Sequence, residues 1–297
     1  MTVIKALIKR NMKLFFRDKG MFFTALITPA ILLVLYISFL GNVYRDSFVT
    51  NLPEGFQLPE KLLNSLVGGQ LISSILAVSC VTISFCSNFL MVQDKATGSI
   101  RDLTIAPVKG SALAISYYIA SLLSTLLICL AAMVLCFGYL AVIGWYLSFT
   151  DVLCLLMDVI LLTLFGTALS SIINHFLSTQ GQISAVGSIV SSGYGFICGA
   201  YMPISSFGEG LQKVISFLPG TYGTSLVRNH SMQGALQEMS NYGMPQTAIQ
   251  EFRDAMDCNL YFFSQPVSIP VMYLILGGTV ALLLTIYILI QRRTKRS

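Results

Sequence analysis

Long apolar runs separated by short polar segments are the feature that most restricts the fold of this chain. A helix needs about 20 apolar residues to cross the hydrocarbon core of a bilayer. Only 10% of the 297 residues are charged, against about 25% in soluble domains. We therefore predict an all-α polytopic membrane protein with one transmembrane domain, residues 1–297. It would have six transmembrane helices at residues 21–41, 66–92, 111–138, 152–173, 183–201 and 269–290.

Two segments outside these spans have an amphipathic or interrupted pattern. Residues 2–19 place Lys5, Lys9 and Lys13 along one helical face and apolar residues on the other. They predict an N-terminal elbow helix on the inner membrane surface, although a merely basic flank would have similar charges. Residues 203–268 begin with an apolar piece that is too short to span and is bounded by glycine and proline. We interpret it as a short re-entrant segment, followed by a polar external loop before the last span.

The basic residues predict the orientation of the chain. Thirteen of the 18 Lys and Arg residues lie in the N-terminal segment, the 93–110 loop or the C-terminal tail. Because cytoplasmic loops carry the excess of such residues, both termini and the 93–110 loop are expected in the cytoplasm. The protein would be a multi-pass component of the cell (plasma) membrane, the lipid bilayer being its environment. The net charge of +5 then reflects orientation rather than nucleic-acid binding.

Two predicted spans carry stripes of small or polar residues at intervals of three or four. Such stripes let helices approach closely in lipid, and the first could equally line a path through the membrane. We interpret both as helix-packing or translocation-path residues. The first stripe includes Ser73, Cys80, Ser84 and Asn88, and the second consists of Gly187, Ser191, Gly195 and Gly199.

The cytoplasmic 93–110 loop contains a short charged helical pattern ended by Pro107, which cannot continue a helix. A helix this short is marginal alone in water. Held between two spans, it would offer a charged contact to a soluble partner, whereas the alternative is a solvated loop. The candidate docking residues are Asp94, Lys95, Gly98, Arg101, Asp102, Leu103 and Pro107.

The sequence lacks the motifs that several functions require. No Gly-Lys-Ser/Thr sequence is present, so the chain has no phosphate-binding P-loop and we expect no ATPase activity. The two histidines, His175 and His230, have no partner cluster in the sequence, which argues against a metal or catalytic site. Asp158 is the one charged residue well inside an apolar run; it is either functional or close enough to the outer interface to reach water.

Three motifs, in order along the chain, carry a resemblance to a known family. They are Phe16-Arg17-Asp18, the 94–108 stretch, and Leu218-Pro219-Gly220-Thr221-Tyr222 followed by Arg228. With them the chain resembles the membrane subunits of ABC exporters of the type-2 permease family. It departs from the family pattern at Ala106, where many members have Thr or Ser, and at Gln93, which is not an acid.

The resemblance implies a function that the residues alone do not. Two permeases, identical or similar, would pair, each seated on a cytoplasmic ABC ATPase subunit that binds ATP and Mg, while this chain binds no cofactor. The 94–107 stretch would be the coupling helix. The substrate would be hydrophobic or amphipathic, such as a drug, an antimicrobial peptide or a lipid, with polysaccharide as the alternative within the family. A stand-alone secondary transporter or channel is the competing class, but such proteins usually show internal repeats or several ionisable residues at mid-membrane.

Overall fold

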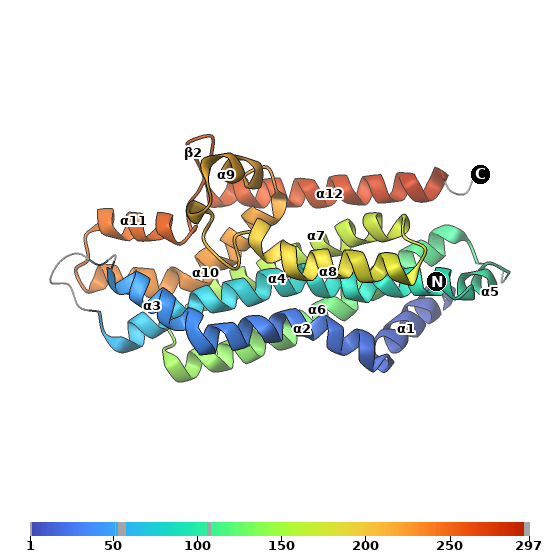
Figure 1. Cartoon of the computed structure of the whole chain (residues 1–297), viewed down its shortest axis with the longest axis horizontal. Helices are drawn as coiled ribbons and strands as arrows, with labels where there is room; N and C mark the ends of the chain where they lie inside the picture. The colour runs from blue at the N-terminus through green and yellow to red at the C-terminus, as the bar shows by residue number, and fades with distance from the viewer. Residues whose placement is uncertain (1, 51, 53–57, 106–107, 294–297) are drawn as a thin grey trace.

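The computed structural model describes residues 2–50, 52, 58–105 and 108–293. Its long elements are all α-helices, most of them aligned with one long axis (Figure 1). The all-α prediction is therefore confirmed, with one short hairpin of two strands added. The elements are α1 (Thr2–Arg17), α2 (Lys19–Leu35), the π-helix η1 (Tyr36–Leu40), α3 (Gly41–Thr50), α4 (Glu60–Ala96), α5 (Ser99–Ile105), α6 (Gly110–Ile143), α7 (Phe149–His175), α8 (Gln180–Ile197), the 3-10 helix η2 (Ile204–Ser206), α9 (Glu209–Ile215), α10 (Pro219–Asn241), α11 (Gln246–Ala255), β1 (Leu260–Phe262), β2 (Gln265–Val267) and α12 (Ile269–Arg293).

The central helix of the bundle is α4, whose 37 residues contact α2, α6, α7, α8 and α10. Its most apolar stretch is buried entirely within the chain. Serine, glycine and alanine recur along it between larger aliphatic residues, so the neighbouring helices can approach on every side. The α4 helix is therefore the core around which the other spans are arranged.

Five helical segments of the described chain are long and apolar enough to cross a membrane. They are Lys19–Thr50, Glu60–Ala96, Gly110–Ile143, Phe149–His175 and Ile269–Gln291. Each extends beyond the span predicted from hydropathy at one or both ends; the first continues through η1 into α3, past its predicted end at residue 41. A polytopic membrane fold is thus confirmed, and the beginning of α1 and the end of α12 lie at the same end of the bundle (Figure 1).

The predicted fifth span, residues 183–201, corresponds to α8, which is not among these five segments. It has 18 residues, about 27 Å at 1.5 Å per residue, and it is enriched in serine and glutamine. The prediction of six crossings therefore stays a prediction. The elbow segment does form a helix, α1, which packs against α6, while its position on a membrane surface also stays a prediction.

The expectation of a polar loop after residue 220 was wrong. Pro219 begins α10, a 23-residue helix that packs against α4, α7 and α12. Its hydropathy is low because many of its buried residues are polar and form hydrogen bonds inside the protein. After it come α11, which starts at Gln246, and the antiparallel pair of β1 and β2. The placement of this region relative to a bilayer, including the re-entrant segment, stays a prediction.

Candidate functional site

The first site joins the N-terminal helix to the end of α4. Arg10 of α1 makes two hydrogen bonds to Asp94, from Nη1 to Oδ2 at 2.6 Å and from Nη2 to Oδ1 at 3.1 Å. The Tyr117 hydroxyl on α6 donates to the same carboxylate. The hydrogen bond to Asp94 raises the pKa of Arg10, against the lowering effect of burial. Such a two-pronged charged pair fixes both distance and orientation, so α1, α4 and α6 are locked together here.

This geometry changes the role that Asp94 can have. The sequence placed its carboxylate among the residues facing a docked partner, yet it is 6% exposed and faces α1 and α6. The reason is that α4 continues as a helix to Ala96, which turns position 94 toward the bundle. No local pattern indicated that Arg10 was its partner, because the two lie 84 positions apart in the chain.

Lys95, the next predicted docking residue, closes the end of a different helix. Its Nζ donates to the carbonyl oxygens of Asn174, His175 and Leu177, at 3.3, 2.6 and 3.2 Å. These are orphan acceptors at the C-terminus of α7, where a positive charge also complements the helix dipole. Lys95 therefore holds α7 against α4 rather than facing away from the bundle.

The chain then turns sharply into the predicted coupling helix. Gly98 has a φ of +79° and is the left-handed residue that ends α4. The seven-residue helix α5 follows, with Arg101 and Asp102 exposed and Leu103 half-buried against the core. Ile105 is 83% exposed, an apolar residue that the sequence analysis did not single out. Pro107 lies outside the described residues.

The first small-residue stripe is buried between helices of the same chain. Asn88 donates to the Ser170 and Ser171 hydroxyls of α7, at 3.1 and 2.7 Å. Ser84 lies 3.2 Å from the Thr167 hydroxyl, Cys80 contacts the Val159 carbonyl, and Ser73 accepts a hydrogen bond from Arg228 of α10. In this structure these four side chains contact α7 and α10.

The second stripe does not form one continuous ridge. Gly187 lies against the Phe89 ring of α4, whereas Gly195 leaves room for the ring of Tyr201, which folds back on α8. Gly199 was wrongly assigned to the ridge because α8 ends at Ile197; with a φ of +72°, Gly199 belongs to the turn that follows. Of the four residues of this stripe, Gly187 and Ser191 line an open groove that separates α8 from its neighbours.

That open space is a groove of about 530 Å³ between α2, α4 and α8. It is open to the outside, and its walls combine hydroxyl groups with aromatic rings and small residues. The lining includes Thr24, Thr28, Thr82, Phe85, Phe89, Ser184, Gly187, Ser188 and Ser191. Neutral hydroxyls beside apolar rings suit a ligand that is largely hydrophobic with a few polar atoms.

Asp158 has partners that the sequence analysis missed. His230 Nδ1 of α10 lies 2.6 Å from Asp158 Oδ2, and the Tyr273 hydroxyl of α12 donates to Oδ1. Asp158 is fully buried, so the expectation that it could reach water was wrong. The three groups come from α7, α10 and α12 and tie these helices together.

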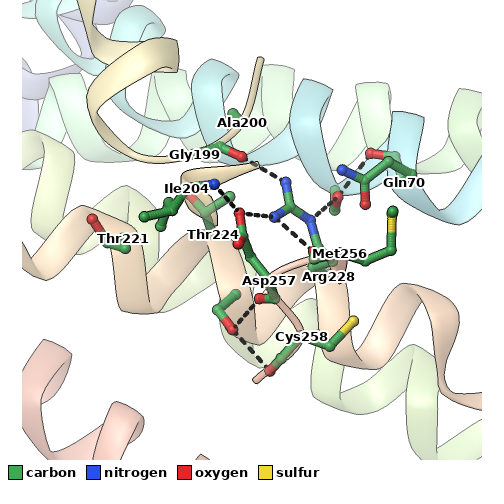
Figure 2. Close-up of polar contacts among 12 residues, drawn as sticks. Gln70, Gly199, Ala200, Ile204, Thr221, Thr224, Arg228, Met256, Asp257 and Cys258 are labelled. Carbon is green, nitrogen blue, oxygen red and sulfur yellow. Dashed lines mark hydrogen bonds and ion pairs between the residues drawn. The ribbon is translucent and has the colours of Figure 1, made fainter. Parts of the chain in front are cut away.

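A second buried charge lies where α8, α10 and the 256–258 turn meet (Figure 2). Arg228 is 1% exposed and donates to the Gly199 carbonyl at 2.7 Å, the Met256 carbonyl at 3.0 Å and Asp257 Oδ2 at 3.3 Å. Asp257 also accepts from the backbone N–H of Ile204 at 2.6 Å. Burial raises the pKa of Asp257, and the Arg228 charge opposes this rise. The sequence analysis identified Arg228 only as part of a family motif and did not indicate its hydrogen-bond partners.

The comparison with protein families decides the identity. The family model described as ABC-2 type transporter matches residues 2–230. The chain belongs to the ABC-2 type transporter family. No curated protein and no solved structure matches it significantly. As an ABC-2 membrane permease domain it is a transport subunit and not an ATPase, and the matched residues contain both the Arg10–Asp94 junction and the groove.

Proposed function

We propose that this ABC-2 permease exports a hydrophobic or amphipathic substrate out of the cytoplasm, and that ATP is hydrolysed by a separate cytoplasmic ATPase subunit. The groove between α2, α4 and α8 carries this proposal. It is large enough for a drug-sized molecule or part of a lipid, and its walls have aromatic rings and hydroxyls. Asp18 at its edge is the one charged side chain among its lining residues. A neutral, partly apolar wall favours such substrates over a polysaccharide.

The proposed coupling route starts at α5 and needs no nucleotide on this chain. An ATPase that moves α5 would also move α4, since only Gly98 and Thr97 separate them. The Arg10–Asp94 pair would carry the motion into α1, and Lys95 would carry it into α7. The groove lies along α4 and α8, so the same motion would change its width. ATP and Mg would bind only to the partner subunit.

The proposed partner at the groove is a second permease, either an identical copy or a similar chain. The α2 and α8 helices flank the groove, and much of their surface is exposed in a single chain. The most apolar stretch of α4, which lies between them, is buried within the chain. A second copy that packs against α2 and α8 would close the groove into a path between subunits. Both termini would be cytoplasmic, as the distribution of Lys and Arg predicts.

The test compares two substitutions that replace a hydroxyl residue with phenylalanine. Ser188 of α8 lines the groove, whereas Thr285 of α12 is exposed and does not line it. In proteoliposomes that contain the permease and its ATPase, Ser188→Phe should reduce ATP-dependent transport of a lipophilic dye, because the ring would fill part of the groove. Thr285→Phe, on neither of the helices proposed to contact the second permease, should transport like the wild type.

Equal transport by the two variants would exclude the groove as the path. Dye movement by the purified permease without ATPase or ATP would instead favour a stand-alone transporter. Stimulation of ATP hydrolysis by oligosaccharides but not by lipophilic compounds would favour polysaccharide export.

A further inference from the structure

Three phenylalanines form an exposed aromatic cluster on the segment between α8 and α12. Phe217 follows α9, and Phe262 and Phe263 are at the tip of the β1–β2 hairpin. The ring centroids are 5.2 Å apart for Phe217 and Phe262, 5.8 Å for Phe217 and Phe263, and 4.9 Å for the hairpin pair. Yet the three residues are 62%, 37% and 57% exposed. A mutually packed cluster with this much exposed ring surface is costly in water.

The exposed apolar surface continues from the cluster along α9. Leu211 and Val214 are 46% and 60% exposed, and they precede Phe217 at intervals of three residues. Such spacing places the three side chains on one side of the chain. In Figure 1, α9 and the hairpin stand to the side of the bundle, next to the beginning of α12, instead of extending its long axis. The elements that carry the cluster therefore lie beside the bundle and not beyond its end (Figure 1).

A groove connects the cluster to the membrane-facing surface of α12. It has a volume of about 370 Å³, its lining is mainly apolar, and Phe217, Phe262, Val271 and Ile275 form part of its wall. On the same helix Val271 is 43% and Leu274 is 74% exposed. Because α12 is one of the five membrane-crossing candidates, its exposed apolar side chains are expected to face lipid. The groove joins the cluster to this surface, since Phe217 and Phe262 line it together with Val271 and Ile275 of α12.

We propose that the Phe217, Phe262 and Phe263 cluster is a membrane anchor, inserted among the acyl chains of bilayer phospholipids, and that the groove beside α12 holds one acyl chain. The occupant is lipid because the cluster continues a lipid-facing helix and projects in the plane of the bilayer. Lys213 of α9 is exposed beside it, where a long basic side chain can reach a phosphate. This inference does not depend on the proposed transport function.

The anchor also has a mechanical connection to the buried charge of Arg228. Leu260 begins the hairpin two residues after Cys258, and the adjoining Asp257 pairs with Arg228 and accepts from Ile204. The hairpin is thus linked through a short turn to the 199–204 segment that follows α8. An anchor at fixed depth would hold this turn while the spans move.

The single tryptophan of the chain makes a direct test possible. In a Trp145→Phe background, Phe263→Trp places the only indole in the cluster. The full-length protein is reconstituted in vesicles of ordinary or acyl-chain-brominated phosphatidylcholine, since bromine quenches tryptophan within the hydrocarbon region. The control is Tyr242→Trp in the same background, at the exposed end of α10. We expect the fractional quenching at position 263 to exceed that at 242 by at least about twofold, as for a side chain below the headgroups.

Equal, weak quenching at both positions would overturn the proposal, and would leave the cluster as a contact for another protein. Phe217→Trp provides a second probe from α9. It should be quenched like position 263 if the whole cluster is inserted. If Phe263→Trp does not elute as a monodisperse protein, Phe217→Trp decides the question alone by the same comparison with position 242.

Discussion

Replacing Arg228 with methionine tests the buried polar cluster at the junction of α8 and α10. Methionine has a similar length and keeps the aliphatic contacts, but removes every donor. Asp257 would lose its cationic partner while retaining the hydrogen bond from Ile204. The carbonyl groups of Gly199 and Met256 would also lose their donor.

The magnitude follows from the burial of both partners. The side chains of Arg228 and Asp257 are 1% and 5% exposed, so water cannot replace what is lost. Breaking a buried ion pair by removing one partner typically costs about 3–5 kcal/mol. The chain contains a matched exposed pair, Arg45 and Glu60, whose side chains are 41% and 82% exposed. There Arg45→Met should cost about 0–1 kcal/mol.

Thermal unfolding of the purified variants in detergent measures the difference. We expect Arg228→Met to lower the melting temperature far more than Arg45→Met. The double variant Arg228→Met/Asp257→Asn should recover part of the loss, because it removes the uncompensated charge. The reasoning from buried charge is wrong if Arg228→Met and Arg45→Met have the same melting temperature. It is also wrong if the melting temperature of the double variant is no higher than that of Arg228→Met.

Three further predictions concern the coupling region and α8. Gly98→Val should cost about 1–2 kcal/mol because of its left-handed backbone, whereas Gly98→Asn should melt near the wild type. Arg10→Gln should cost about 1–2 kcal/mol by breaking the partly exposed pair with Asp94, and it should reduce ATP-dependent transport. Lys13→Gln, at an exposed position of the same helix, should change neither. Gly195→Leu should cost about 1–3 kcal/mol by clashing with the Tyr201 ring, and Tyr201→Ala should relieve part of that cost, as thermal unfolding would show.

Hydropathy predicted most of the helical bundle because a membrane span needs a long apolar run. The same rule failed for α10, whose buried face carries Arg228, Asn229 and several hydroxyls. Such a helix is stabilised by hydrogen bonds to α4, α7 and the 256–258 turn, and these partners are far away in the sequence. The end of α8 was also misplaced, since the regular spacing of small residues continued past Ile197 into the turn at Gly199.

The candidate site was predictable in location but not in orientation. Charge and proline marked residues 93–110 as a special loop, and α5 forms there. The partners of Asp94 and Lys95, however, belong to α1, α6 and α7, and no local pattern specifies which way a short charged helix faces. Ile105 was overlooked because a single apolar residue carries no signal until its exposure is known. The groove likewise depends on how α2, α4 and α8 pack.

Photocrosslinking from position 105 tests the central claim most directly. Ile105 is 83% exposed on α5, and Tyr242 at the end of α10 provides an exposed control position. A photoreactive amino acid at position 105, activated in intact membranes, should cross-link this permease covalently to a cytoplasmic protein. That protein should also be labelled by a photoreactive ATP analogue, whereas position 242 should give no such cross-linked product. The claim would be contradicted if position 105 yields no ATP-binding product in membranes whose permease still transports substrate.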